Sequence, residues 1–361
     1  MSKLYVKKDW AWRRYESTDI YIPETETLFW SDEFTGSSLN TANWGAMNAT
    51  FASGNSESQL YRPANIEISA ATVGGSGNSC KIISKQETIS GLSISDAPQL
   101  SLGTYAAPMT ELPAGTRYWT SGMMSTRDAS PKRYFPLFGR YEMRARFPFG
   151  QGTLPAFWLR RAAFDDGTSG GASWGEVDIF EHFGSWKHGY AKYSMHFPNT
   201  IGVNATQQSI QVETPVPGST TGWHTYDVQI RPKPLTPEHT DPLKCPIQFT
   251  AHLDGVQYAS YLLEDELSIR DLHMIKRSTG EPGRNDNLSW DICVNNAVGG
   301  KWVGQPDQQL GYLPLVDKCS KNQGTPAGND PMVCDSSGLF FVQFPCTYEI
   351  DYVRVYEYTW E

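Results

Sequence analysis

Short segments in which apolar and polar residues alternate recur along the chain from Leu28 onward. In residues 141–147 the apolar side chains occupy the odd positions and the charged ones the even positions, and residues 247–253 repeat the alternation. Successive side chains of a β-strand point to opposite faces, so each segment predicts a strand with one buried face. Because Gly, Pro, Asn, Asp and Ser separate the segments, the pattern indicates an all-β sandwich or barrel.

Turn and loop signals complete this prediction. Asp254-Gly255 lies between two strand-like runs, which is a strong signal for a β-hairpin. Helical patterns are scarce, and residues 264–275 have room for one or two helical turns. Three long stretches rich in Gly, Pro and polar residues, 160–173, 232–244 and 303–335, are predicted loops. Loops of such length tend to be functional or to form the walls of binding sites.

The alternating pattern also divides the chain. Residues 1–27 are charged and rich in Tyr and Trp without a clear period, and we interpret them as an N-terminal extension. Residues 28–361 are predicted to form a single catalytic domain, because all-β domains often exceed the average domain length. No run of about 18 apolar residues, as needed to span a bilayer, is present.

Composition and charge narrow the possible functions. Hydrophobic residues make up 39% of the chain and charged residues 19%, which argues against disorder. The 12 Trp and 18 Tyr residues suit either a thick aromatic core or stacking against sugar rings. The net charge of −9 and the lack of a long basic run argue against binding to nucleic acid or an anionic membrane. They favour a neutral polysaccharide over a sulfated one.

Six cysteines allow fifteen complete pairings, so the sequence does not determine the disulfides. Cys319 and Cys334 flank a polar loop and could form one, whereas Cys80 and Cys293 lie in apolar runs and are predicted to be buried thiols. No CxxC spacing is present, which argues against a zinc cluster.

Residues 175–182, with the sequence GEVDIFEH, concentrate carboxylates. Glu176 and Asp178 are two positions apart and share one face of a strand, while strict alternation would bury Glu181 among apolar side chains at a high energetic cost. A β-bulge near Ile179–Phe180 would return Glu181 to the acidic face. The segment therefore predicts a bulged strand that presents three carboxylates side by side.

The spacing of these carboxylates points to one kind of chemistry. With the bulge, the Cα atoms of Glu176 and Glu181 are about 13 Å apart at roughly 3.3 Å per residue. Their side chains can lean together until the carboxyl groups are about 5–5.5 Å apart, the spacing of retaining glycosidases. Asp178 between them can share a proton with Glu176. The alternative is an acidic, solvated edge strand, but like charges on one face destabilise a sheet and nothing nearby in sequence neutralises them.

The motif and its surroundings resemble glycoside hydrolase family 16. The ExDxxE pattern of residues 176–181 is similar to the bulged form of its laminarinase-like, agarase-like and carrageenase-like branches, and differs from the shorter form of lichenases and xyloglucan transglycosylases. Further similar segments, in the same order along the chain, are residues 32–34, 138–148, 150–159, 296–302 and 349–356. The resemblance to the laminarinase-like branch covers about residues 28–358.

This resemblance implies a β-jelly-roll sandwich of two curved antiparallel sheets with an open concave cleft. It also implies that Glu176 is the nucleophile, Asp178 the assisting carboxylate and Glu181 the acid/base. Substrate-binding residues implied in the same way are Trp158, Trp174, His196, Trp302, Asn55, Glu57 and Gln59, the last three in a polar loop at the non-reducing side. For Trp158 a place in the core, and for His196 a merely structural hydrogen bond, are the alternative interpretations.

The family often binds a structural calcium ion on the convex face. The matching positions are Glu33, the backbone carbonyl of Gly77 and Asp351, and calcium prefers such oxygen ligands. Ordinary surface carboxylates are the alternative. The chain also departs from the family, with Met123 where laminarinases often carry Arg and with long loops at 232–244 and 303–335. These departures concern the substrate more than the chemistry.

We therefore expect a retaining endo-glycoside hydrolase that cleaves β-1,3-glucan of the laminarin type, or mixed 1,3-1,4 linkages, by double displacement and without a cofactor for catalysis. The same chemistry on agar, carrageenan or a capsular glycan, a transglycosylase, and a glucan-binding module without hydrolysis are the alternatives. We expect a monomer whose partner is a polysaccharide, not nucleic acid or a membrane. We also expect an extracellular protein, although residues 1–14 lack the apolar core of a signal peptide.

Overall fold

The structure is a computed structural model of the 361-residue chain. It describes residues 4–8, 11–15, 25–49, 57–90, 117–148, 152–161, 175–182, 190–198, 207–217, 221–233, 245–263, 288–299, 303 and 344–359. In these parts the regular structure is β-strand apart from one short 3-10 turn, η1 (Pro63–Asn65). None of the described residues forms a helix long and apolar enough to cross a membrane.

Within the described residues, the larger of the two main sheets has ten strands. They are β3 (Thr25–Asp32), β5 (Gln59–Tyr61), β6 (Ile66–Ala70), β7 (Asn78–Ile89), β8 (Arg117–Ser121), β11 (Gly139–Arg146), β16 (His224–Pro232), β17 (Ile247–Leu253), β18 (Val256–Leu263) and β20 (Cys346–Thr359). The strand order is β18-β17-β16-β11-β20-β7-β8-β5, and β3 also pairs with β20 and β6 with β7. The pairs are antiparallel except β5 with β8.

The smaller main sheet has eight strands in the part of the chain that the structure describes. They are β4 (Gly45–Ala46), β9 (Met123–Ser125), β10 (Phe135–Pro136), β12 (Thr153–Arg161), β13 (Glu176–Glu181), β14 (Tyr190–Pro198), β15 (Gln207–Pro215) and β19 (Leu288–Val298). The order is β15-β14-β13-β12-β19-β9-β4, and β10 pairs with β19. A separate antiparallel pair is formed by β1 (Leu4–Lys8) and β2 (Ala11–Tyr15).

The core lies between the two main sheets and consists of the apolar half of each alternating strand. Tyr141 and Met143 from β11 and Val353 from β20 contribute from the larger sheet, and Val177 from β13 and Ile292 from β19 from the smaller one. All five are fully buried. Burial of large apolar side chains is the main favourable term in such a sandwich.

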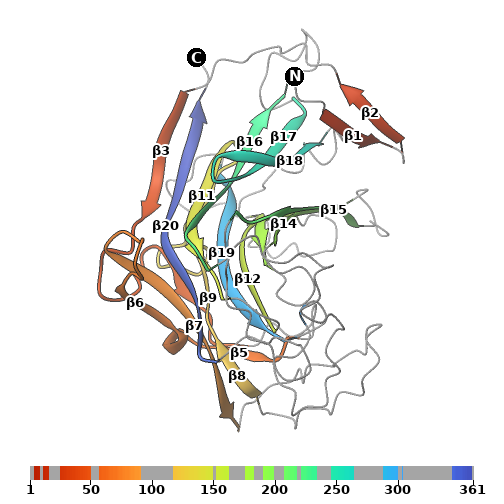
Figure 1. Ribbon diagram of the computed structural model, residues 1–361. Helices are drawn as coiled ribbons and strands as arrows, with labels where there is room; N and C mark the ends of the chain where they lie inside the picture. The colour runs from red at the N-terminus through yellow and green to blue at the C-terminus, as the bar shows by residue number, and fades with distance from the viewer. Residues whose placement is uncertain are drawn as a thin grey trace, which may run out of the picture.

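Both sheets bend in the same sense (Figure 1). Strands β20 and β11 of the larger sheet lie beside β19 and β12 of the smaller sheet, which is on the inner side of the bend. The face of the smaller sheet that points away from the core is therefore concave, and the outer face of the larger sheet is convex. The predicted all-β fold of two curved antiparallel sheets is confirmed.

The turn after β17 and two of the cysteines agree with the local predictions. Asp254 and Gly255 have φ angles of 50° and 75°, which suit the type I′ turn expected between β17 and β18. Cys80 and Cys293 are buried free thiols, as predicted. The possible pair Cys319 and Cys334 and the possible helical turns at 264–275 lie outside the described residues.

Two boundaries differ from or extend the expectations. Strand β12 continues to Arg161, where a loop was expected from residue 160, because Arg160 pairs in register with Asp291 of β19 and extends the ladder. Strand β3 begins at Thr25 and pairs with β20, ahead of the predicted domain start at residue 28. The division into an extension and one domain remains a prediction.

Candidate active site

Strand β13 carries the three carboxylates and contains the predicted bulge. Against β12, Phe157 pairs with Phe180 and Trp158 with Asp178, so Ile179 is the extra residue. The register against β14 shifts at the same place. Ile179 and Phe180 are both fully buried in the core. The bulge thus buries two successive apolar side chains and keeps all three carboxylates on the concave face.

Cross-strand neighbours arrange the concave face in three rows. Each row runs across the strands in the order β14, β13, β12, β19. The first row is Lys192, Glu181, Ala156 and Asn295, and the second is Ser194, Asp178, Trp158 and Cys293. The third row is His196, Glu176, Arg160 and Asp291. Side chains directly opposite each other in a sheet interact. Each carboxylate of β13 therefore has one side-chain partner on β14 and another on β12.

Strand β14 supplies the positive charge that local sequence did not offer. His196 Nε2 lies 3.1 Å from Asp178 Oδ2 and 4.0 Å from Glu176 Oε1. Lys192 Nζ lies 3.3 Å from Glu181 Oε2, and Ser194 Oγ donates to the same oxygen at 3.1 Å. His196 thus lies beside the carboxylates, and its role in binding substrate stays a prediction. Lys192 and Ser194 were not predicted, although they share a strand face with His196 at a spacing of two.

The carboxyl groups of Glu176 and Asp178 titrate together. Burial raises the pKa of Glu176 to about 8, and the negative charge of Asp178 adds to the increase. Burial, followed by the charge of Glu181, also raises the pKa of Asp178. Two adjacent carboxyls of this kind hold one proton between them. The Asp178 side chain is 6% exposed and that of Glu176 34%, so we expect the proton on the less solvated Asp178.

Trp158 lies opposite Asp178, with only 9% of its surface exposed. A chain of hydrogen bonds fixes its ring. Trp158 Nε1 donates to Asn295 Oδ1 at 2.8 Å, and Asn295 Nδ2 donates to the Tyr61 hydroxyl at 3.0 Å. Tyr61 in turn donates to Glu57 Oε2 at 3.1 Å. Trp158 is therefore both largely buried and adjacent to the carboxylates.

Glu57 and Gln59 belong to the polar loop that was predicted to contact the glucan, but both side chains are buried. Glu57 and Gln59 are 5% and 0% exposed. Gln59 Nε2 donates to Glu57, and Gln59 Oε1 accepts a hydrogen bond from the backbone of Val298. This burial argues against direct contact between Gln59 and a sugar, and Glu57 reaches the site through Tyr61. Asn55, Trp174 and Trp302 lie outside the described residues.

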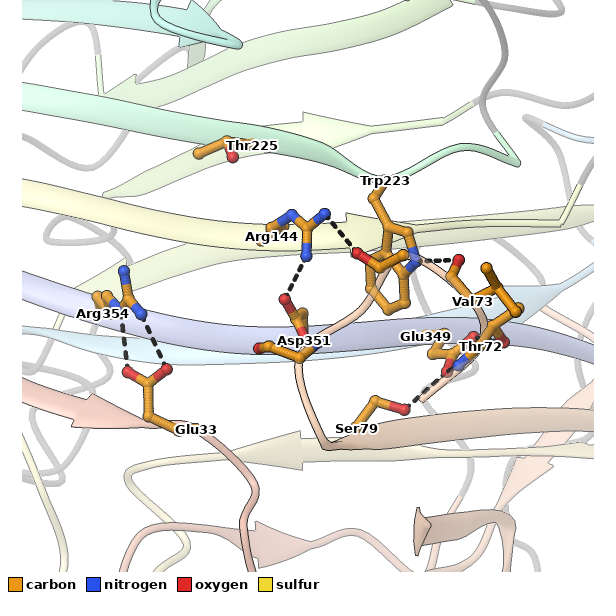
Figure 2. Close-up of polar contacts among 12 residues, drawn as sticks. Glu33, Thr72, Val73, Ser79, Arg144, Trp223, Thr225, Glu349, Asp351 and Arg354 are labelled. Atoms are coloured by element: carbon orange, nitrogen blue, oxygen red, sulfur yellow. Dashed lines mark hydrogen bonds and ion pairs between the residues drawn. The ribbon is translucent and has the colours of Figure 1, made fainter. Parts of the chain in front are cut away.

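The residues predicted to bind calcium are engaged otherwise (Figure 2). Both oxygens of Glu33 accept hydrogen bonds from Arg354, at 2.8 and 2.9 Å. Asp351 Oδ2 lies 2.5 Å from Arg144 Nη1, and the carbonyl of Gly77 accepts a hydrogen bond from the backbone of Ala71. Two guanidinium groups thus neutralise the two carboxylates. This arrangement does not fit a calcium ion held by these three groups, and we assign calcium no role.

A neighbouring carboxylate on the convex face, Glu349, holds the turn between β6 and β7 (Figure 2). It accepts hydrogen bonds from the backbone and the hydroxyl of Thr72, at 2.8 and 2.5 Å, and from Ser79 Oγ at 2.7 Å. Trp223 Nε1 donates to the carbonyl of Val73 in the same turn. The polar groups of this region therefore satisfy one another.

Comparisons with known proteins agree with this arrangement. The family model described as "Glycosyl hydrolases family 16" matches residues 76–236, which include β13 and its carboxylates. The β-glucanase of Rhodothermus marinus is 26% identical over 339 residues, which are 92% of this chain and 85% of that protein.

Solved structures share the fold. The laminarinase from Rhodothermus marinus is 25% identical, with a TM-score of 0.54 over 93% of this chain and 99% of that one. The laminarinase catalytic domain from Thermotoga maritima is 21% identical, with a TM-score of 0.57 over 92% and 98% of the two chains. Since the family model spans the bulged strand and the likeness to laminarinases extends over most of both chains, the chain belongs to glycoside hydrolase family 16 and to its laminarinase-like members.

Proposed function

We propose that this protein hydrolyses β-1,3-glucan as a retaining, endo-acting enzyme. As a member of its family it is a glycoside hydrolase, and relatives named β-glucanase and laminarinase support the choice of glucan. The observation that carries the proposal is the bulged strand β13, which holds Glu176, Asp178 and Glu181 on one concave face against Lys192 and His196 of β14.

In the proposed mechanism, Glu176 attacks the anomeric carbon while Glu181 protonates the leaving oxygen. A covalent glycosyl-enzyme forms, and Glu181 then deprotonates the water that releases the sugar with retained configuration. Asp178 holds the shared proton, so Glu176 carries the negative charge that a nucleophile needs. No cofactor is required for these steps.

The contacts of Glu181 suit an acid/base. Lys192 and Ser194 both contact its Oε2. Among the described residues, none donates a hydrogen bond to Oε1, so this oxygen is free to exchange a proton with the substrate and the water. Lys192 and Ser194 hold the carboxyl group in one orientation, which preserves its alignment with the reacting bond.

The paired charges favour a neutral polymer. In the three rows, the lysine and the arginine each face a carboxylate: Lys192 faces Glu181 and Arg160 faces Asp291. Within the three rows, no lysine or arginine lacks a carboxylate partner and is left to bind a sulfate group. Because a glucan polymer does not cross a membrane unaided and the three carboxylates come from one chain, we also propose that the protein acts outside the cell as a monomer.

The test is the release of new reducing ends from soluble β-1,3-glucan, beside a Glu176→Gln variant. We expect release by the wild type only, products of several sizes, and a β-anomer as the first product by proton NMR. A first product with the α-anomer would contradict retention. If the wild type cleaves agar, carrageenan or a capsular glycan but not β-1,3-glucan, the substrate assignment is wrong. Products longer than the starting glucan chains would show a transglycosylase.

A further inference from the structure

The third row of the concave face contains a charged pair that the proposed mechanism does not use. Arg160 on β12 lies directly opposite Glu176. Its neighbour Leu159 is fully buried in the core, so alternation places Arg160 on the concave face. The Arg160 side chain is 12% exposed, whereas its partner Asp291 on β19 is fully buried.

Asp291 binds one edge of the guanidinium group. Arg160 Nε lies 3.2 Å from both Asp291 oxygens, and Arg160 Nη2 lies 2.6 Å from Oδ2. A guanidinium group has five N–H donors, and Nε and Nη2 account for the contacts with Asp291. Among the described residues, Nη1 has no hydrogen-bond partner. The Arg160 side chain keeps 12% of its surface exposed on the concave face, and Nη1 is the end of the guanidinium group that Asp291 does not contact.

A structural role alone gives a weak account of this pair. Taking an arginine and an aspartate out of water costs free energy that their attraction barely repays, and two apolar side chains would pack there at less cost. Arginine is instead suited to hold a fixed planar set of donors toward a ligand. Asp291 fixes the plane of the guanidinium group and leaves the Nη1 donors directed away from itself.

The charge of the pair indicates the chemistry of its ligand. Arg160 and Asp291 together are neutral, and the neighbouring Arg127 and Asp128, 4.0 Å apart, add a second neutral pair. Nη1 therefore offers hydrogen bonds without a net positive field, which suits the hydroxyl oxygens of a neutral sugar. Arg160 lies directly opposite Glu176, and the sugar that this nucleophile would attack is the one on the non-reducing side of the cleaved bond.

We propose that Arg160, oriented by Asp291, binds a hydroxyl group of the glucosyl unit on the non-reducing side of the cleaved bond and so contributes to substrate specificity. The proposal rests on the proposed hydrolysis of β-1,3-glucan. Arg160 is then a substrate-binding residue, and Asp291 is a positioning residue that acts through it.

The test measures binding of a β-1,3-linked glucotetraose by calorimetry in the Glu176→Gln background, which prevents cleavage. The Arg160→Met variant alone would leave Asp291 buried without the cation that it binds, so the decisive variant carries Arg160→Met together with Asp291→Leu. We expect the double change to weaken binding by about 10- to 100-fold, as for the loss of hydrogen bonds from a charged donor. In the active enzyme, KM should rise by more than kcat falls.

Two further variants separate recognition from folding. Arg160→Lys keeps a positive charge beside Asp291 but lacks the second pair of planar donors. We therefore expect this variant to bind the glucotetraose almost as weakly as the double variant. The control is Arg354→Met with Glu33→Leu, a more exposed ion pair on the convex face, which should leave affinity within about twofold.

The outcomes are distinct. Unchanged affinity in the double variant, or full restoration by Arg160→Lys, overturns the role of Arg160 while the hydrolysis of glucan by the wild type still stands. Tighter binding of an oligosaccharide that carries a carboxylate, lost with Arg160, would show recognition of charge and overturn the hydroxyl assignment. If the wild type neither binds nor cleaves the glucan, the proposed function and this inference both fail.

Discussion

The two faces of the sandwich use carboxylates in opposite ways. On the convex face, Glu33 binds Arg354, Asp351 binds Arg144, and Glu349 accepts three hydrogen bonds from Thr72 and Ser79. On the concave face Glu176, Asp178 and Glu181 crowd one strand, and the pKa of the first two is raised by burial and by their neighbours.

This difference separates structural from catalytic carboxylates. An acid that is held by an arginine or by hydroxyl and backbone donors stabilises a turn or a strand pair. Acids that share a proton remain near the point at which a proton can move, which is what acid/base chemistry requires. The comparison predicts that changes on the concave face affect activity, while similar changes on the convex face affect stability.

The largest effect is expected for Glu176→Ala. Loss of the nucleophile should reduce the hydrolysis of β-1,3-glucan by about 10⁴-fold or more. The melting temperature should not fall, because the change removes one of two crowded carboxyls. Sodium azide should restore bond cleavage and give an α-glycosyl azide, detectable by NMR. Glu33→Ala on the convex face is the control and should keep activity within about twofold. An active Glu176→Ala variant without azide would remove Glu176 from the mechanism.

Lys192→Met should have the next largest effect. Without Lys192, the carboxyl of Glu181 keeps only the hydrogen bond from Ser194. We expect kcat to fall by about 10- to 100-fold, in line with the loss of a charged hydrogen bond, and KM to change little. Steady-state kinetics with Lys192→Arg, which retains the charge, provide the matched control. A rise in KM at constant kcat would mean that Lys192 binds substrate and does not orient Glu181.

Alternation along single strands was enough to predict much of the site. The conflict between burying Phe180 and exposing Glu181 identified the bulge, because it arises within six consecutive residues. The buried face of β11 and the turn at Asp254-Gly255 followed from equally local patterns. Local signals of this kind do not depend on which strands later become neighbours.

Contacts between distant segments could not be predicted in this way. Lys192 opposes Glu181 only because β14 pairs with β13 in one register, and a shift by one residue would turn Lys192 to the core. Arg144 and Asp351 are 207 positions apart, and their pairing changes the interpretation of the calcium site. Arg160 was counted in a loop because its partner Asp291 belongs to a strand far along the chain.

On the convex face, Glu349→Gln should reduce stability and leave activity intact. The amide keeps the shape of the side chain but offers one acceptor oxygen in place of two to Thr72 and Ser79. We expect the free energy of unfolding to fall by about 1–3 kcal/mol, measured by urea denaturation. The kcat/KM on glucan should stay within about twofold. A large loss of activity with unchanged stability would contradict the division between the two faces.

The shared proton predicts a smaller, pH-dependent effect. In the unfolded chain Glu176 loses its proton near pH 4.5, whereas the raised pKa keeps a proton on the folded pair up to about pH 8. The folded state therefore binds more protons in this window, and stability should fall as the pH rises through it. Asp178→Asn removes the repulsion and should flatten the decline in melting temperature between these pH values, by a few degrees. Asp351→Asn should keep the wild-type slope. The same slope in Asp178→Asn and in the wild type would show that the pair does not share a proton.

The smallest effect is expected for removal of divalent metal. Because Arg354 and Arg144 neutralise Glu33 and Asp351, a calcium ion at this place would have to displace two ion pairs. Treatment with EDTA should therefore change the melting temperature by less than about 1 °C, and added calcium should not raise it. The Arg144→Met variant sharpens the test, since it frees Asp351 from its cation. If calcium stabilises this variant but not the wild type, the arginine occupies the place of the metal. If EDTA lowers the melting temperature of the wild type and calcium restores it, calcium binds despite the arginines, and the convex face is not held by its ion pairs alone.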